Sequence, residues 1–276
     1  MKILRALILI LVSLVAIFPL YWQLNGSFME NLVVVRTPPP LLPIGGDLEN
    51  YKVIIANFPI WKWFLNSAVV CLGTVGLQLF IALPAAYAIE IKRFRGHRIV
   101  WGMFLASMML TSQLSLIPLY RLMRVVGLTT RRLGLILPFC FSVLPIFILR
   151  SYLKSFPRAV LDAAEIDGAG EGRRLIGIVV PMCIPVLTAL GAISMVGAWN
   201  NYFWQSIVAN TARTRTLVVG VARVIYDYVI YRQLGVEWVD YGVLMAGAMI
   251  VFLPMGLFFV FSCRYAFKGL FAGREG

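Results

Sequence analysis

The long uncharged stretches of this chain limit how it can fold more than any other feature. One of them, Leu175 to Ala212, runs for 38 residues without an Asp, Glu, Lys or Arg. A helix of about 20 apolar residues is enough to cross the hydrocarbon core of a bilayer. Only 13% of the residues are charged, against about 25% in soluble domains. A soluble fold would have too few polar side chains to cover its surface, so the chain is predicted to be a membrane protein.

The apolar stretches predict an all-α, polytopic membrane protein that forms one transmembrane domain over residues 1–276 and crosses the bilayer in six helices. The expected spans are 5–28, 63–90, 99–120, 133–150, 176–199 and 241–263. Pro138 and Pro145 predict a kinked or broken fourth helix. The uncharged residues left after the fifth span, 200–210, predict a re-entrant or interfacial segment.

The connecting segments differ in composition and in charge. Residues 29–61 contain Pro38–Pro40 and Gly45–Gly46, which exclude regular structure there and predict an external loop. The segment 92–98 instead carries four basic residues in seven positions, and two more basic residues precede the first span. Lys and Arg are retained on the cytoplasmic side of membrane proteins. With an even number of spans, both termini are therefore expected in the cytoplasm.

Several function classes lack their sequence signals. The net charge of +13 comes from basic residues scattered between apolar runs, so nucleic-acid binding is not expected. The four cysteines lie within apolar runs without CxxC spacing, and no metal site is predicted. The chain has no GxxxxGK[ST], HExxH or GxSxG motif, so no catalytic residue and no cofactor of its own are expected. No acid lies in the central parts of the spans, which disfavours a proton-coupled carrier.

One polar stretch, 155–181, interrupts the apolar sequence and holds four of the twelve acids. These acids are Asp162, Glu165, Asp167 and Glu171. Pro157 suits the first turn of a helix, and Gly168 can adopt the left-handed conformation that ends one. The stretch is therefore predicted to form two short helices that meet at Gly168, the second running into the fifth span. The small Ala163 and Ala164 would let another protein approach closely, with carboxylates beside them. On the residues alone, a solvated amphipathic loop is an equally good interpretation.

The spacing of this stretch resembles the cytoplasmic EAA loop of ABC importer permeases. Asp162-Ala163-Ala164 is followed by Gly168 and then by Ile178 to Pro181. The segment 162–169 is similar to the carbohydrate-uptake branch, in particular to the second permease of maltose-type systems. The family pattern has Glu where this chain has Asp162 and Leu where it has Val180, and both departures keep the charge or the apolar character. Other motifs carry the resemblance along nearly the whole chain: Phe18 to Trp22, Asn66-Ser67, Ala85 to Ala88, Phe94 to Gly96, Ile117 to Tyr120, Gly127-Leu128, Trp199-Asn200, Thr216-Leu217 with Gly220, and Lys268-Gly269.

The resemblance implies a subunit of an ATP-driven importer in the inner membrane of a bacterial or archaeal cell. Its expected partners are a second permease subunit in a heterodimer, a pair of ATPase subunits that bind ATP and Mg, and an extracytoplasmic solute-binding protein that delivers a sugar. The cytoplasmic loop 151–175 would dock on an ATPase, and the tail 264–276 is a weaker contact candidate. The residues implied in this coupling are Asp162, Ala163, Ala164, Glu165, Asp167 and Gly168.

A path for a sugar needs hydroxyl partners and aromatic faces. The candidates are Ser112, Gln113, Trp199, Asn200, Asn201 and Tyr202. The alternative is that these polar groups only bond to neighbouring helices, with Trp199 as an anchor at the membrane interface. An oligosaccharide, a disaccharide, a polyol and glycerol phosphate all fit as substrates. The arginines of 121–132 are compatible with an anionic solute, with contact to the binding protein or with lipid.

Two functions of other classes compete with the importer subunit. One is a self-sufficient secondary carrier or channel for small polar solutes, and the other is an integral membrane enzyme. Neither explains the spacing from Asp162 to Gly168, and the sequence shows no convergent set of His, Cys and carboxylate residues for catalysis.

Overall fold

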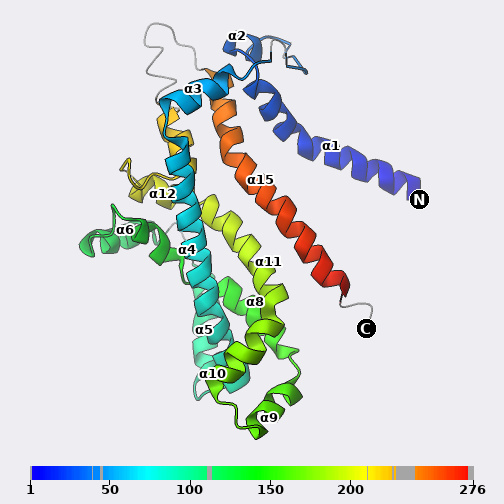
Figure 1. The fold of residues 1–276 in the computed structure, drawn as a ribbon, viewed down its shortest axis with the longest axis vertical. Helices are drawn as coiled ribbons and strands as arrows, with labels where there is room; N and C mark the ends of the chain where they lie inside the picture. The colour runs from blue at the N-terminus through cyan, green and yellow to red at the C-terminus, as the bar shows by residue number, and fades with distance from the viewer. Residues whose placement is uncertain are drawn as a thin grey trace. The chain divides into compact units, whose positions relative to one another are not determined.

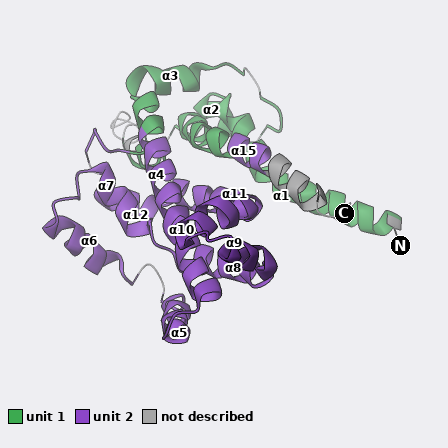
Figure 2. Ribbon diagram, turned by 60° about the horizontal axis from the view of Figure 1, so that its bottom comes forward, with its two compact units in different colours: residues 1–65, 216–256 green, residues 66–215, 257–276 purple. Residues whose placement is uncertain are grey.

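The structure is a computed structural model that describes residues 2–38, 40–43, 46–110, 114–209, 211–225, 227 and 240–272. These residues form helices joined by turns, and the described part of the chain contains no strand. This agrees with the all-α class predicted from the sequence. The chain divides into two compact units, shown in Figure 2. Unit 1 comprises residues 1–65 and 216–256, and unit 2 comprises residues 66–215 and 257–276.

Within the described residues, four helical segments are long and apolar enough to cross a membrane (Figure 1). They are Ile3–Ser27, Ile60–Lys92, Glu171–Trp199 and Tyr241–Ser262. The helices that form them are α1 (Lys2–Ser27), α4 (Ile60–Tyr87) with the π-helical turn η1 (Ala88–Lys92), α10 (Glu171–Arg174) with the π-helical turn η3 (Leu175–Val179) and α11 (Val180–Trp199), and α15 (Tyr241–Ala272). In the most apolar part of α1, no residue is buried against the rest of the protein. A helix that is apolar on every side is stable when lipid surrounds it.

A fifth candidate span is a broken one. The segments Arg132–Phe139 and Val143–Lys154 pass the same test together but are bent by 44°. The first consists of α7 (Arg132–Ile136) and the 3-10 turn η2 (Leu137–Phe139), and the second is α8 (Val143–Lys154). Pro138 lies in η2, and Pro145 lies in the first turn of α8. Because proline lacks an N–H and its ring clashes with the preceding turn, it favours a break at these positions. The interruption expected within 133–150 is therefore present.

The expected single helix over 99–120 is not what the structure describes. Helix α5 (His97–Ser107) ends early, and α6 (Leu116–Val125) begins after the residues 111–113, which lie outside the described part. The N–H groups of Met109 and Leu110 bond to carbonyls three residues back, at 3.1 and 3.2 Å, so the chain leaves the α-helical pattern there. Pro118 could not donate to the carbonyl of residue 114 in a continuous helix, and its ring would clash with it. The apolar composition of the segment did not reveal this interruption.

Two short helices lie in the segment 29–61, which was expected to be a loop. They are α2 (Asn31–Val34) and α3 (Glu49–Asn57), on either side of the Pro- and Gly-rich residues. In unit 1 the buried Asn50 of α3 donates hydrogen bonds to the carbonyls of Ser27 and Met29, at 3.0 and 2.8 Å. These bonds attach the end of α1 to α3. Unit 1 also contains α13 (Leu217–Val219) and the π-helical turn η4 (Gly220–Ile225).

The main core of unit 2 joins six elements. Side chains of α4, η1, α8, α9 (Arg158–Ile166), η3 and α11 form one apolar cluster. Its fully buried members are Ala86, Ile146, Leu149, Val179 and Cys183. Because lipid is as apolar as these side chains, the close packing itself, rather than removal from water, holds such helices together. A second cluster contains Trp204 of α12 (Tyr202–Val208), whose indole N–H donates to the carbonyl of Gly134 at 3.0 Å. The segment 200–210 thus contains a short helix, α12, that packs against other helices of unit 2.

Candidate functional site

The polar stretch 155–181 of unit 2 contains helix α9, which is attached to the core by apolar side chains. The helix follows Pro157 and begins at Arg158. Leu161 is the buried residue of α9, with 4% of its surface exposed, and it belongs to the core cluster together with Phe156. A short amphipathic helix of this kind is held by its buried side rather than by intrinsic helix propensity. The opposite side of α9 is consequently fixed in place while it faces outward.

The exposed face of α9 carries most of the residues predicted to couple. Asp162, Ala163, Glu165, Asp167 and Gly168 are exposed, and Ala164 is half-buried. Between two of the carboxylates lies Ile166, which is 87% exposed. The sequence predictions did not include Ile166, although a single large apolar residue between Glu165 and Asp167 is a visible signal. An apolar side chain flanked by carboxylates offers both a packing contact and partners for basic groups of another protein.

Gly168 ends α9 through a specific turn. Its φ angle is +75°, in the left-handed region. The N–H of Gly168 bonds to the carbonyl of Glu165 at 3.0 Å, and the N–H of Ala169 bonds to the carbonyl of Ala164 at 2.9 Å. This pair of bonds defines the Schellman motif, in which a glycine follows the last helical residue because it has no Cβ to oppose the left-handed conformation. The two-helix arrangement that meets at Gly168 is present, as the sequence predicted.

Charged groups tie α9 to its neighbours. The guanidinium of Arg174, on α10, contacts Glu165 of α9 at 2.6 Å and also pairs with Glu171. Glu171 in turn contacts the ammonium of Lys92 at 2.5 Å and accepts a hydrogen bond from the hydroxyl of Tyr87 at 3.1 Å. We call these five side chains the loop network. It connects α9 with α10, with η1 and with the end of α4.

A second charged cluster lies deeper in unit 2. The carboxylate of Glu90 is 5% exposed and contacts Arg150 at 2.9 Å and Arg93 at 3.0 Å. The guanidinium carbon of Arg150 lies 4.2 Å from the centre of the Trp101 ring. A buried carboxylate needs such partners because an unpaired charge is costly in an apolar interior. The cluster fastens η1, α8 and α5 to one another. Glu90 was not among the predicted site residues, since its partner Arg150 is 60 positions away in sequence.

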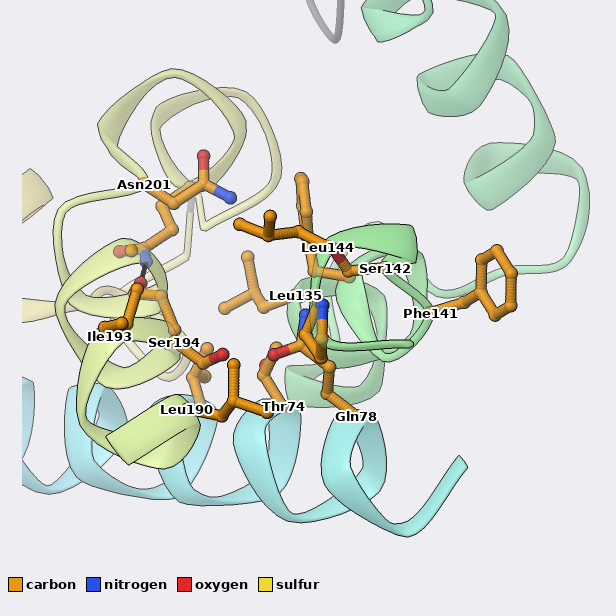
Figure 3. Close-up of a pocket in the computed structure, with 16 residues that line it drawn as sticks. Thr74, Gln78, Leu135, Phe141, Ser142, Leu144, Leu190, Ile193, Ser194 and Asn201 are labelled. Atoms are coloured by element: carbon orange, nitrogen blue, oxygen red, sulfur yellow. Dashed lines mark hydrogen bonds between the residues drawn. The ribbon is translucent and has the colours of Figure 1, made fainter. Parts of the chain in front are cut away.

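A cavity of about 320 Å³ lies within unit 2, between α4, the α7–α8 break, α11 and α12. Figure 3 shows Thr74 and Gln78 from α4 and Ser194 from α11 at this cavity, together with Asn201. Ser142 and Gln205 also line it. The side-chain oxygen of Gln78 is buried and has no hydrogen-bond partner in the described residues. A cavity of this volume with a few convergent polar groups is typical of a small-molecule site.

The residues predicted for a sugar path lie in different places. Asn201 lines the cavity. Trp199 is buried at the end of α11, Asn200 is exposed in the turn that follows, and Tyr202 starts α12, and none of the three lines the cavity. Ser112 and Gln113 lie outside the described residues. The described part of the chain contains no cluster of three or more His, Cys, Asp or Glu residues that could hold a metal ion.

Comparisons with known proteins agree with these features. No family model matches the chain. The chain is 32% identical, over 94% of its length and 84% of the relative, to a diacetylchitobiose uptake system permease protein of Streptomyces coelicolor. It is 29% identical, over 99% of its length and 95% of the relative, to an arabinooligosaccharides transport system permease protein of Bacillus subtilis. A chain in the crystal structure of a bacterial ABC transporter, involved in the import of the acidic polysaccharide alginate, has the same fold. Its TM-score is 0.83 at 22% identity, with 96% of this chain and 95% of that chain covered.

The described helices include apolar ones long enough to cross a membrane, and the relatives of the chain are transport subunits rather than catalytic enzymes. The relatives are permeases matched over nearly their whole length. The chain belongs to the family of permease subunits of carbohydrate ABC importers.

Proposed function

We propose that this chain forms half of a translocation pore and that helix α9 receives the motion of an ATPase subunit. The observation that carries this proposal is the exposed face of α9, anchored by Leu161 and terminated by Gly168. The partners in the proposal are a second, different permease subunit, ATPase subunits that bind ATP and Mg, and an extracytoplasmic solute-binding protein. The chain crosses the inner membrane six times, with 99–120 as the third span and both termini in the cytoplasm.

Within this proposal, the coupling residues have distinct parts. Ala163 and Ala164 allow close approach of the ATPase, while Asp162, Glu165 and Asp167 bind its basic side chains. Closure of the ATPase pair on ATP would displace α9. The loop network then passes the displacement to α10 and from there to α11, since Arg174 lies at the start of that continuous helical run. Rigid packed helices transmit such motion because their interfaces have discrete arrangements rather than a continuous range.

The first prediction separates an importer subunit from a self-sufficient carrier or channel. Reconstituted alone in lipid vesicles, the chain should hydrolyse no ATP, because it has no phosphate-binding loop. It should also transport no sugar, because it forms only half of the proposed pore. With its partner subunits, ATP and the binding protein, the same vesicles should accumulate the sugar. Uptake is measured with a radiolabelled oligosaccharide. Transport by the chain alone, unaffected by ATP depletion, would establish the carrier instead.

For the substrate, we propose a carbohydrate with several hydroxyl groups, and the names of the relatives favour an oligosaccharide or a disaccharide. The cavity supports a contact between this subunit and the sugar, since Thr74, Gln78, Ser194 and Asn201 supply donors and acceptors from three sides. Of the residues predicted for the path, Asn201 is the one at this cavity. Trp199, Asn200 and Tyr202 remain part of the proposed path outside it. Ser112 and Gln113, which are not among the described residues, remain candidates for the path.

A second prediction concerns Gln78. In the complete importer, Gln78→Leu should raise the KM for sugar uptake about tenfold, because loss of one or two hydrogen bonds costs about 1.4 kcal/mol. Folding should not suffer, since the lost oxygen has no partner among the described residues. The matched control is Gln23→Leu on α1, which makes the same chemical change at a residue that does not line the cavity. An unchanged KM in the Gln78 variant would remove the cavity from the sugar path.

A further inference from the structure

An arginine-rich cavity of about 440 Å³ lies in another part of unit 2. Arg131 and Arg132 at the start of α7 line it from one side, and Arg213, in the segment after α12, lines it from the other. We call these three residues the basic cradle. The remaining lining residues are Thr130, Leu133 and Thr214. Among the described residues, no Asp or Glu lines this cavity, and its three arginines distinguish it from the cavity at Gln78, whose lining side chains are neutral.

The charges of the basic cradle are not compensated within the described residues. No Asp or Glu in that part of the chain forms an ion pair with Arg131, Arg132 or Arg213. Like charges that converge on a concave surface repel one another and create a strong local potential. The described arginines that serve structure, such as Arg150 and Arg174, have carboxylate partners instead. The basic cradle therefore lacks the counter-charge that structural arginines have.

A single buried amide sets the geometry of the cradle. Asn66 of α4 has 0% of its surface exposed. Its side-chain oxygen accepts a hydrogen bond from Nε of Arg132 at 3.0 Å. Its side-chain nitrogen donates to the carbonyls of Arg213 and Arg215, at 3.0 and 2.8 Å. One residue thus fixes both sides of the cavity. Because Asn66 occupies Nε of Arg132, the two terminal nitrogens of that guanidinium are left for a ligand.

We propose that the basic cradle is an anion site that binds a phosphate or carboxylate group. The planar fork of a guanidinium matches both groups in paired hydrogen bonds. Asn66 holds the guanidinium of Arg132 in place before a ligand arrives, which lowers the ordering cost of binding. The anionic group belongs either to a soluble solute or to a phospholipid head group. The site is independent of the coupling role of α9 and does not require that role to be correct.

The test uses the complete importer in nanodiscs of neutral phosphatidylcholine. Glycerol phosphate and galacturonate are titrated as soluble probes by calorimetry, and retained phosphatidylglycerol is measured by native mass spectrometry after exchange into mixed-lipid nanodiscs. The wild type should bind at least one probe class, with affinity that falls as salt is raised. Arg131→Gln and Arg213→Gln should each weaken that binding about tenfold, since each removes a charged hydrogen-bonding partner.

The matched control is Arg124→Gln on α6, which also removes one exposed positive charge but does not line the cavity. It should bind as the wild type does. Binding of a soluble probe alone identifies a solute site, and retention of phosphatidylglycerol alone identifies a lipid site. Absence of both, or equal weakening in the Arg124 variant, would overturn the proposal. So would a result in which the Arg131 and Arg213 variants lose only affinity for the solute-binding protein.

Discussion

Replacing Gly168 by leucine should leave the importer assembled in the membrane but reduce sugar uptake at least about tenfold, while ATP hydrolysis continues. Gly168 has a φ angle of +75°, where a residue with a Cβ is strained by about 1–2 kcal/mol. An added Cβ would meet no other atom within 4 Å, so the effect comes from the turn and the docking face, not from a clash in the core. Uptake and hydrolysis are measured on the same reconstituted complexes, and their ratio reports the coupling.

Two control variants separate the effect of the left-handed turn from the effect of a larger side chain. Gly172→Leu places the same side chain nearby, at a glycine that also has open space around it but no positive φ. Gly168→Asn keeps a residue that tolerates the left-handed conformation better than leucine does. We expect both controls to retain most of the uptake. If Gly168→Leu transports normally, the turn has no part in coupling, and if Gly172→Leu fails equally, bulk alone is responsible.

Removing the carboxylate of Glu90 should have the largest effect on stability. In Glu90→Leu the partly buried Arg150, whose side chain is 18% exposed, loses its counter-charge. Loss of one partner of a buried ion pair costs about 3–5 kcal/mol. The midpoint of thermal unfolding, followed in a fixed detergent, should fall by several degrees relative to the wild type. The variant should also expose helix α8 to proteolysis earlier on heating, because the ion pair between α8 and η1 is gone.

The control for Glu90 is a double substitution. Glu90→Leu combined with Arg150→Met removes both charges, and it should recover part or all of the lost stability because no buried charge is left alone. Arg93, the other partner of Glu90, has a side chain that is 50% exposed and can be hydrated. A double variant that is less stable than Glu90→Leu would show that the charge of Arg150 is satisfied elsewhere, and the account of this cluster would then be wrong.

The local features of the polar stretch 155–181 were predictable from sequence. Pro157 and Gly168 set the two ends of α9 through backbone geometry that depends on a few neighbouring residues. Helix α11 ends at Trp199 and α15 begins at Tyr241, the positions at which the sequence placed span boundaries. Abrupt changes in charge or polarity mark both boundaries within a few residues.

Features that depend on distant residues were not predictable. Tyr87 and Glu171 are 84 positions apart, and Glu90 and Arg150 are 60 apart, so no local pattern connects them. The cavity at Gln78 is built from four parts of unit 2. The interruption after α5 was missed for another reason: the hydrophobicity of 99–120 is that of a span, and it outweighed the signal of Pro118.

The double pairing of Arg174 has a consequence for how firmly α9 is attached. Glu165 is 67% exposed on its side chain, whereas Glu171 keeps two further partners, Lys92 and Tyr87. If a basic residue of a docking subunit takes Glu165, Arg174 still has Glu171 and no charge is stranded. The ion pair between Glu165 and Arg174 can therefore break and form at a low cost in free energy, because Arg174 stays paired with Glu171. In the proposed mechanism, an ATPase subunit would bind and release α9 in each cycle without unfolding the loop 151–175.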